Sequence, residues 1–263
     1  MRITFLGTGT SHGVPMIGCR CPTCTSPDPR DTRLRPSIYV ETAAAHVLVD
    51  AGPDLRAQAL RHGITRVDAI LFTHGHADHI LGMDDVRRFN ALRAGQGIDG
   101  VMPCYGDAAT LDDIRRMFSY VFDPATPKGG GLPQLDLRPI DGPIAVDGLE
   151  VIPVPLHHGK RPILGFRFER VAYLTDCNHI PDESWPLLEG LDVLVLDALR
   201  LRRHPTHFSL DEAVAAARRI GAARTFFTHM CHDLLHAATD ACLPAGMALA
   251  YDGLVLDVAD GAR

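Results

Sequence analysis

Three histidines and one aspartate lie within six residues in the segment Thr-His-Gly-His-Ala-Asp-His. The apolar run from Asp68 to Phe72 precedes this segment and predicts a strand, so the polar groups are expected in the loop at its carboxyl end. Imidazole nitrogens and carboxylate oxygens together bind zinc or manganese, whereas burying them without a partner costs free energy. The segment therefore predicts a metal site. Its expected ligands are His74, His76, Asp78 and His79.

A second group of candidate ligands lies in residues 18–36, which show neither helical nor strand periodicity. Cys19, Cys21 and Cys24 offer three thiolates at spacings that suit one tetrahedral zinc ion, and such an ion would organise the segment. Three buried or reactive cysteines are the alternative. The seven cysteines of the chain are odd in number, which favours metal binding in a reducing cytosol over a disulfide framework.

Alternating strands and helices must position these groups. The clearest helix runs from Ser209 to Ile220, because Ser209 and Glu212 form a capping box and Gly221 ends the helix. The Asp-Gly pair at 252–253 predicts the turn of a terminal hairpin. Strands in each half with helices between them predict an α/β fold, a four-layer αββα sandwich. Further strands are expected over 2–6, 37–41, 46–49, 149–155, 165–168, 171–174, 191–196 and 224–227, and further helices over 53–62, 77–93, 107–118 and 183–189.

Composition narrows the class of protein. The 263 residues are 46% hydrophobic and no linker divides them, so we expect a single domain over 1–263. The formal net charge of −6 disfavours binding to nucleic acid or to an anionic membrane surface. No stretch approaches the roughly 20 apolar residues of a membrane span, and no signal peptide is visible. We therefore expect a cytoplasmic protein that acts on a small molecule. A homodimer is compatible with the sequence.

The pattern His-x-His-x-Asp-His after a strand that ends in threonine resembles the signature of the metallo-β-lactamase superfamily of hydrolases. The resemblance implies further ligands at His158, Asp176 and His229, with His157 as the alternative to His158. It implies two divalent metal ions, manganese or zinc, that activate a water molecule for hydrolysis. One ion takes His74, His76 and His158, the other takes Asp78, His79 and His229, and Asp176 bridges them.

Three further motifs make the resemblance more specific. Gly-Thr-Gly-Thr-x-x-Gly-Val-Pro at 7–15, Cys-x-Cys-x-x-Cys at 19–24 and Thr-His-x-x-His at 228–232 resemble the phosphoribosyl 1,2-cyclic phosphate phosphodiesterases of the carbon-phosphorus lyase pathway. That family implies hydrolysis of a small cyclic phosphodiester and a separate structural zinc, for which His232 is the fourth ligand. It also implies catalytic roles for Asp78 and His207, with His207 as a proton donor or phosphate contact.

The sequence also leaves alternative functions to consider. A ribonuclease Z-like RNA phosphodiesterase would need a protruding basic arm, which the sequence lacks. A cofactor-biosynthesis protein related to pyrroloquinoline quinone synthesis shares the cysteine-rich start, but its weaker metal motif does not match the ligand set here. A non-enzymatic metal-binding module has no reason to retain every ligand. His12 stands where the family carries a different polar residue, so the preferred ester is expected to differ if His12 faces the cleft.

Overall fold

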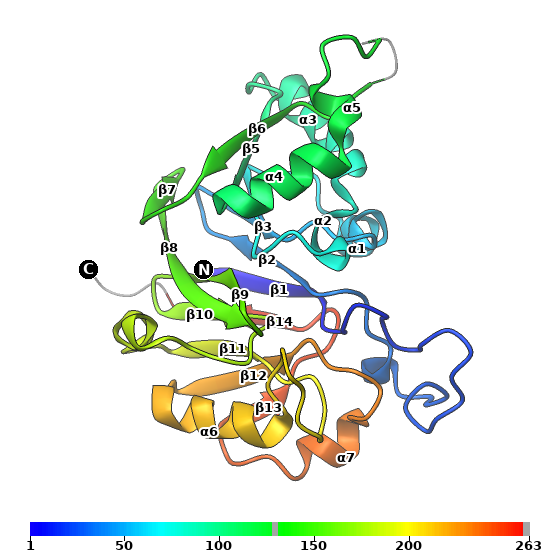
Figure 1. The fold of residues 1–263 in the computed structure, drawn as a ribbon, viewed down its shortest axis with the longest axis vertical. Helices are drawn as coiled ribbons and strands as arrows, with labels where there is room; N and C mark the ends of the chain where they lie inside the picture. Colours follow the sequence, from blue (N-terminus) through cyan, green and yellow to red (C-terminus); the bar gives the residue numbers. More distant parts are fainter. Residues whose placement is uncertain (128–130, 260–263) are drawn as a thin grey trace.

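Two mixed β-sheets form the centre of the computed structural model, which describes residues 1–127 and 131–259 (Figure 1). Within these residues each sheet has seven strands. The first sheet has the order β14 (Val255–Asp257), β1 (Arg2–Gly7), β2 (Ser37–Glu41), β3 (His46–Val49), β4 (Ala69–Leu71), β5 (Met102–Gly106), β6 (Leu135–Pro139). The second sheet has the order β13 (Met247–Leu249), β12 (Arg224–Thr228), β11 (Val193–Asp197), β10 (Val171–Leu174), β9 (Arg161–Phe168), β8 (Leu149–His158), β7 (Ile144–Val146).

Helices cover the outer faces of both sheets. Figure 1 shows α1 to α5 beside the first sheet and α6 beside the second. The α-helices are α1 (Leu55–His62), α2 (Ala77–Ile80), α3 (Val86–Gly95), α4 (Ala108–Met117), α5 (Ser119–Phe122), α6 (Leu210–Ile220) and α7 (His236–Asp240). Residues 1–127 and 131–259 also contain the 3-10 helices η1 (Pro29–Asp31), η2 (Met83–Asp85) and η4 (Asp182–Leu188).

The buried apolar side chains divide into three clusters that correspond to the layers. Strand β11 shows the division, because Val193 and Val195 join a cluster that both sheets share, while Leu194 and Leu196 join a cluster with α6. This alternation follows from the period of two along a strand. A third cluster lies between the first sheet and helices α1, α3 and α4. The predicted α/β sandwich with αββα layering is confirmed.

Two predicted elements differ from the structure. The helix expected over 77–93 is divided into α2, η2 and α3. The amide of Gly82 leaves the helical pattern and donates to the Ala51 carbonyl at 2.8 Å. A side chain there would collide with the Gly52 carbonyl oxygen, 2.0 Å from an added Cβ. The helix expected over 183–189 is the 3-10 helix η4, which contains Pro186, a residue without the N–H that an α-helix needs.

The predicted terminal hairpin is wrong. Strand β13 pairs with β12 in the second sheet, whereas β14 pairs with β1 in the first, so the turn at 252–253 carries the chain from one sheet to the other. The side chain of Asp252 explains why. Its carboxylate accepts hydrogen bonds from the backbone N–H groups of Thr8 (2.9 Å) and Leu34 (2.7 Å), which fixes the turn between the two segments.

Candidate metal centre

The predicted ligands follow the carboxyl ends of strands from both sheets. The segment with His74 and His76 follows β4, while Asp176 follows β10 and His229 follows β12. His158 is the last residue of β8. Strands β3 to β6 run parallel, and so do β10 to β13, so their carboxyl ends bring residues distant in sequence to one edge of the sandwich.

Four of these side chains form a first ligand group. One potential ligand atom from each lies within 4.8 Å of those of the other three. Its members are His74, His76, His158 and Asp176. The neighbouring His157 is outside this group and pairs its ring with that of His179 at a centroid distance of 5.4 Å. Of the two adjacent histidines, His158 therefore faces the site.

A second group shares Asp176 with the first and meets the same 4.8 Å criterion. Its other members are Asp78, His79 and His229. Oδ2 of Asp176 lies 3.4 Å from Nε2 of His79 and 3.7 Å from Nε2 of His74, while Oδ1 lies 2.8 Å from Nε2 of His229. One carboxylate thus faces both groups, which is the position of a bridging ligand.

The donor set fits two divalent cations. In the described part of the chain, Nε2 of His79 and Nε2 of His229 are buried and form no hydrogen bond of acceptable geometry, although carboxylate oxygens lie nearby. Buried polar atoms are rarely left without a partner. Burial also holds the pKa of His74 well below its usual range. Nitrogen and oxygen donors of this kind accept zinc or manganese.

Asp50 orients one of the ligands and was missed from the sequence. It follows β3, is fully buried, and its Oδ2 lies 2.7 Å from Nδ1 of His79. Thr73 donates both its backbone N–H and its hydroxyl to this carboxylate, each at 2.9 Å. Because Nδ1 is engaged by Asp50, Nε2 of His79 is the nitrogen presented to the site. The only signal for this role in the sequence was a carboxylate directly after an apolar strand.

Asp197 has a similar position on the other sheet and was also missed. It is fully buried at the end of β11, and its Oδ1 lies 3.2 Å from Nδ1 of His207 and 3.5 Å from Nδ1 of His229. The backbone N–H of Phe208 donates to its Oδ2 at 3.0 Å. The rings of His207 and His229 stack at a centroid distance of 4.7 Å. The structure therefore brings the predicted catalytic His207 to the edge of the second ligand group.

Backbone strain is concentrated at the same place. Asp50, Asp176 and His229 have φ angles of 61°, 57° and 60°. Residues other than glycine adopt this left-handed region at a cost, and such residues gather at functional sites. Each of the three lies just after a strand that ends at the centre. The strain is thus tied to the turns that direct their side chains inward.

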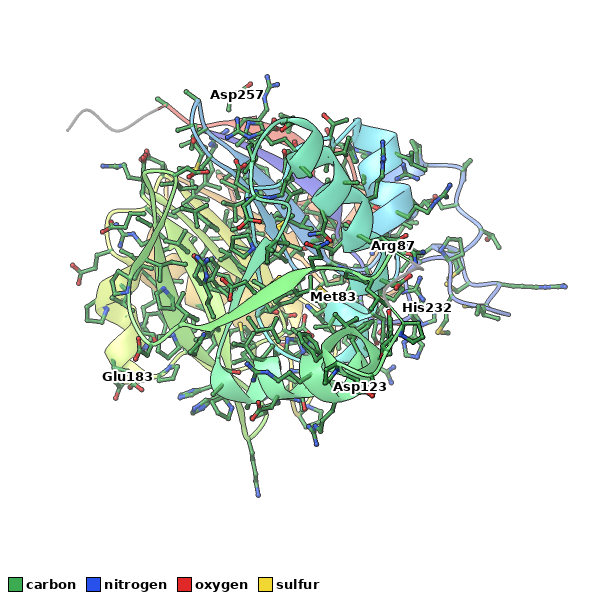
Figure 2. The ribbon with its side chains drawn as sticks, turned by 90° about the horizontal axis from the view of Figure 1, so that it is seen from above. Met83, Arg87, Asp123, Glu183, His232 and Asp257 are labelled. Atoms are coloured by element: carbon green, nitrogen blue, oxygen red, sulfur yellow. The ribbon has the colours of Figure 1, made fainter. Side chains whose placement is uncertain are left out.

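The cysteine segment meets His232 in a separate cluster. Nδ1 of His232 lies 3.2 Å from Sγ of Cys19, 3.5 Å from Sγ of Cys21 and 3.6 Å from Sγ of Cys24. Figure 2 shows His232 beside the projecting loop that carries the cysteines. The backbone N–H of Cys24 points at Cys21 and lowers the pKa of that thiol to about 7, which favours the thiolate. Three sulfurs and one nitrogen suit a tetrahedral zinc ion.

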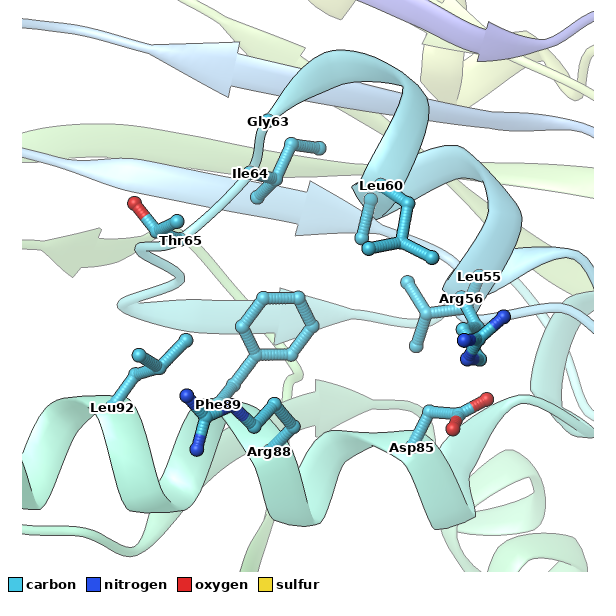
Figure 3. Close-up of a pocket in the computed structure, with 11 residues that line it drawn as sticks. Leu55, Arg56, Leu60, Gly63, Ile64, Thr65, Asp85, Arg88, Phe89 and Leu92 are labelled. Atoms are coloured by element: carbon cyan, nitrogen blue, oxygen red, sulfur yellow. The ribbon is translucent and has the colours of Figure 1, made fainter.

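Two cavities differ in their relation to the centre. An apolar cavity of about 330 Å³ lies between α1 and α3 and has Leu60, Phe89 and Leu92 on its walls, but none of the predicted ligands (Figure 3). A polar cavity of about 290 Å³, here called the His207 pocket, lies between His207 and His232. Its lining consists of Thr10, Ser11, His12, Gly13, Met16, Leu199, Arg200, Arg202, His204, His207, Cys231, His232 and Asp233.

Comparison with known proteins agrees with this geometry. Residues 45–230 match the family model of the beta-lactamase superfamily domain. The chain belongs to this superfamily. A solved structure described as a new diphosphatase from the PhnP family is 46% identical, covers 98% of both chains and superposes with a TM-score of 0.91. The protein is therefore a hydrolase of the metallo-β-lactamase fold that resembles the PhnP family, as the sequence predicted.

Two curated relatives add to this placement in the superfamily. An octanoyltransferase of Porphyromonas gingivalis is 37% identical over 258 residues, which are 97% of this chain but 51% of that protein. The chain thus spans about half of that relative, so the transferase activity is not assigned to it. A ribonuclease Z of Bradyrhizobium diazoefficiens is 35% identical over 119 residues, 44% of this chain and 33% of that enzyme.

In the described residues, no helix has the length and apolar character of a membrane span.

Proposed function

We propose that this protein is a metal-dependent phosphodiesterase that hydrolyses a small cyclic phosphodiester, such as phosphoribosyl 1,2-cyclic phosphate, within a single domain of residues 1–263. The observation that carries the proposal is the pair of ligand groups that share Asp176, with His207 at their edge. The similarity to a diphosphatase of the PhnP family supports it, because that enzyme also hydrolyses a phosphate link. A small anionic substrate is consistent with the small His207 pocket.

The side chains of the centre are proposed either to bind the metal ions or to position the residues that bind them. His74, His76 and His158 would hold one divalent ion. Asp78, His79 and His229 would hold the other ion, and Asp176 would bind to both. Two bound ions, manganese or zinc, would lower the pKa of water and neutralise charge on the phosphate. Asp50 holds the imidazole of His79 through its 2.7 Å contact with Nδ1, while Asp197 lies 3.5 Å from Nδ1 of His229 and 3.2 Å from Nδ1 of His207.

His207 is the proposed proton donor to the leaving oxygen. Its Nδ1 faces the buried carboxylate of Asp197 at 3.2 Å, so Nε2 is the nitrogen available to the substrate. The ring is buried against His229 and His158, with centroid distances of 4.7 and 4.6 Å, which limits its rotation. A positioned imidazole that protonates an alkoxide leaving group accelerates the reaction by about 10²- to 10⁴-fold. Asp78 is the other proposed catalytic residue, through its place in the second ligand group.

The cysteine cluster is proposed as a structural zinc site. Three sulfurs and one nitrogen from the protein would fill all four positions of a tetrahedral ion and would leave none for a substrate. Met16 donates its backbone N–H to Sγ of Cys24 at 3.3 Å, which ties the neighbouring loop to the cluster. Zinc here would fix the segment 18–36, which has no α-helix or strand in the structure.

A diphosphatase is the second candidate, favoured by the 46% identical relative of that description. Its substrate would contain a phosphoanhydride instead of a cyclic ester, and both could use the same metal ions. A ribonuclease Z activity has less support, because that match covers 44% of the chain and the protein carries an acidic net charge. The complete ligand set favours turnover over a carrier role in cofactor biosynthesis.

A substrate panel tests the proposal. Protein loaded with manganese or with zinc would be assayed on ribose cyclic phosphates, 2′,3′-cyclic nucleotides, diphosphate diesters, aryl diesters and precursor transfer RNA. We expect the highest kcat/KM on a ribose cyclic phosphate. Highest activity on a diphosphate diester would establish the second candidate. Cleavage of precursor transfer RNA alone, or no hydrolysis of any diester, would overturn the proposal.

A further inference from the structure

We propose that the apolar cavity between α1 and α3, here called the α1–α3 cavity, binds a medium-chain carboxylate such as octanoate, with the hydrocarbon chain inside the cavity and the carboxylate on Arg88. This inference goes beyond the proposed function, because neither His207 nor any of the candidate metal ligands lines the cavity. The apolar part of its lining consists of Leu55, Ala59, Leu60, Ile64, Phe89 and Leu92. The hydrocarbon chain of the ligand would contact these side chains.

The sequence places these apolar side chains on facing surfaces of the two helices. On α1, Leu55 and Ala59 are four positions apart, so they lie on one face of the helix. On α3, Phe89 and Leu92 are three positions apart and share a face in the same way. Leu55 and Phe89 are buried and form the floor of the cavity, whereas Leu60 is 66% exposed at its wall. A hydrocarbon chain that covers this leucine removes apolar surface from water, which favours binding.

Arg88 brings an unpaired positive charge to the edge of this apolar lining. Among the described residues, Arg88 has no ion pair and no side-chain hydrogen bond, whereas the adjacent Arg87 pairs with Asp84 at 3.0 Å. Figure 3 shows the Arg88 side chain directed toward the Leu92 end of the cavity. Its guanidinium keeps its charge and its N–H donors for a ligand. A planar guanidinium matches a carboxylate, to which it donates two parallel hydrogen bonds.

The other charged groups of the lining are Arg56 and Asp85, which Figure 3 shows at the opposite end of the cavity from Leu92. Arg56 also has no ion pair in the described part of the chain. Two arginines and one aspartate leave a formal charge of +1 around the cavity, although the whole chain carries −6. One negative charge on the ligand balances this surplus. A monocarboxylate is therefore favoured over a dianionic phosphate monoester and over an uncharged lipid.

The volume of the cavity suits a small amphiphile. It is about 330 Å³, at the lower end of the range for small-molecule sites. A chain inside it should gain affinity with each buried methylene, about fourfold per group, until the cavity is full. A longer chain would project into water and gain little more. This dependence on chain length distinguishes a bounded site from adsorption to an open apolar surface, where the affinity would continue to rise.

The α1–α3 cavity is separate from the metal centre, although the two share a neighbouring turn. A Cβ added to Gly82 would lie 2.9 Å from Cβ of Leu55, so the floor of the cavity touches the turn that follows α2. Helix α2 carries Asp78 and His79. Neither residue lines the cavity, and we therefore expect the carboxylate to bind with and without metal ions.

Calorimetry would measure the binding of hexanoate, octanoate, decanoate and octan-1-ol to the metal-loaded protein. We expect octanoate to bind about 15-fold more tightly than hexanoate, with a smaller gain from octanoate to decanoate. Octan-1-ol has the same chain length but no charge, and should bind about 10-fold more weakly than octanoate. Arg88→Gln should weaken octanoate binding about 10- to 100-fold and leave octan-1-ol unchanged. Arg87→Gln, at the adjacent paired arginine, is the matched control and should bind octanoate as the wild type does.

Leu60→Gln tests the apolar wall of the cavity. Leu60 is exposed, so the substitution leaves the buried core intact. It should weaken the binding of octanoate and of octan-1-ol by a similar factor, because both ligands place the same chain against it. Circular dichroism of each variant would check the fold, and hydrolysis of an aryl diester would check the metal centre.

The outcomes separate this inference from the proposed function. Equal affinity for octanoate and octan-1-ol, or unchanged octanoate binding in Arg88→Gln, would reject carboxylate recognition at Arg88. Failure of all three acids to bind would reject the cavity as their site. A dimer in sedimentation that Leu60→Gln dissociates would show that a second copy of the chain covers the cavity, which also overturns the inference. Octanoate binding by a protein that hydrolyses no diester would overturn the proposed function alone.

Discussion

Oδ2 of Asp50 lies 2.7 Å from Nδ1 of His79, although Asp50 follows strand β3 and His79 lies in helix α2. Asp50 contributes no atom to either ligand group, yet it determines which nitrogen of His79 reaches the metal centre. The orientation of a ligand thus depends on a buried carboxylate that also accepts two hydrogen bonds from Thr73. This contact leads to the first prediction.

Asp50→Asn should weaken metal binding at the second ligand group about 10- to 100-fold, because an amide holds the imidazole less firmly and contributes no charge. Competition with a chromophoric chelator would measure the affinity. Asp68→Asn is the matched control, since Asp68 is buried on the same sheet but accepts its hydrogen bonds from His46 and Arg66. Equal affinity in Asp50→Asn and wild type would show that His79 is held without Asp50.

His207→Ala should lower kcat about 10²- to 10⁴-fold on alkyl esters with poor leaving groups and far less on activated aryl diesters, which leave without a proton. Steady-state rates on the two substrate types would measure the difference. His157→Ala is the control, because His157 lies on β8 beside His158 but pairs with His179. Equal losses on both substrate types would eliminate His207 as the proton donor.

The purified protein should contain about three metal ions per chain, two that a chelator removes readily and one held by thiolates. Cys21→Ser should reduce the count to about two, because it removes one of the four candidate ligand atoms that Cys19, Cys21, Cys24 and His232 bring together. The exposed Cys242 lies outside the cluster, so Cys242→Ser should keep the full content. Elemental analysis of the three purified proteins would measure the number of metal ions per chain. A wild-type count of one or two would contradict part of the scheme.

Asp252 should make stability depend on pH. Burial raises the pKa of this carboxyl to about 6, so the folded protein holds the proton more tightly than the unfolded chain does. The resulting stabilisation is complete below about pH 4 and is lost as the pH rises through about 6, a change on the order of 3 kcal/mol in the free energy of unfolding.

Denaturant unfolding of metal-free protein at about pH 4.5, where most of this stabilisation is present, and at about pH 7.5, where it is lost, would test the effect. Asp252→Asn cannot ionise, so the difference in unfolding free energy between the two pH values should shrink by about 2 kcal/mol. The exposed Asp257, paired with Arg2, gives the control Asp257→Asn, which should behave as the wild type. An unchanged pH dependence in Asp252→Asn would show that other groups cause it.

The sequence predicted best those ligands of the metal centre that lie close together in the chain. The ligands from His74 to His79 lie within six residues, so their chemistry is visible without a fold. His158, Asp176 and His229 required the family resemblance, because single polar residues after strands are common. Asp50 and Asp197 were missed for the same reason. Their importance arises from contacts to His79 and His207, residues 29 and 10 positions away, and no local pattern encodes such contacts.

Prediction of the fold from the sequence is limited in the same way, because long-range contacts decide some of its elements. Hydrophobic alternation predicted the strands and the four layers, since burial depends on the period of the pattern. It did not predict the break at Gly82, which is set by the close approach of Gly52. Nor did it distinguish a hairpin from a crossing at Asp252, because an Asp-Gly pair suits either turn. The decisive contacts are those with Thr8 and Leu34, more than 200 positions away in the chain.

The crossing at Asp252 also concerns how the chain folds during synthesis. Strand β1 has one neighbour in β2 and its other neighbour in β14, which is translated last among the strands. Until residues 255–257 leave the ribosome, the edge of β1 carries unpaired backbone groups that can template pairing with other chains. A ribosome stalled shortly before β14 would therefore hold an aggregation-prone intermediate whose ligands from His74 to His229 have already been made.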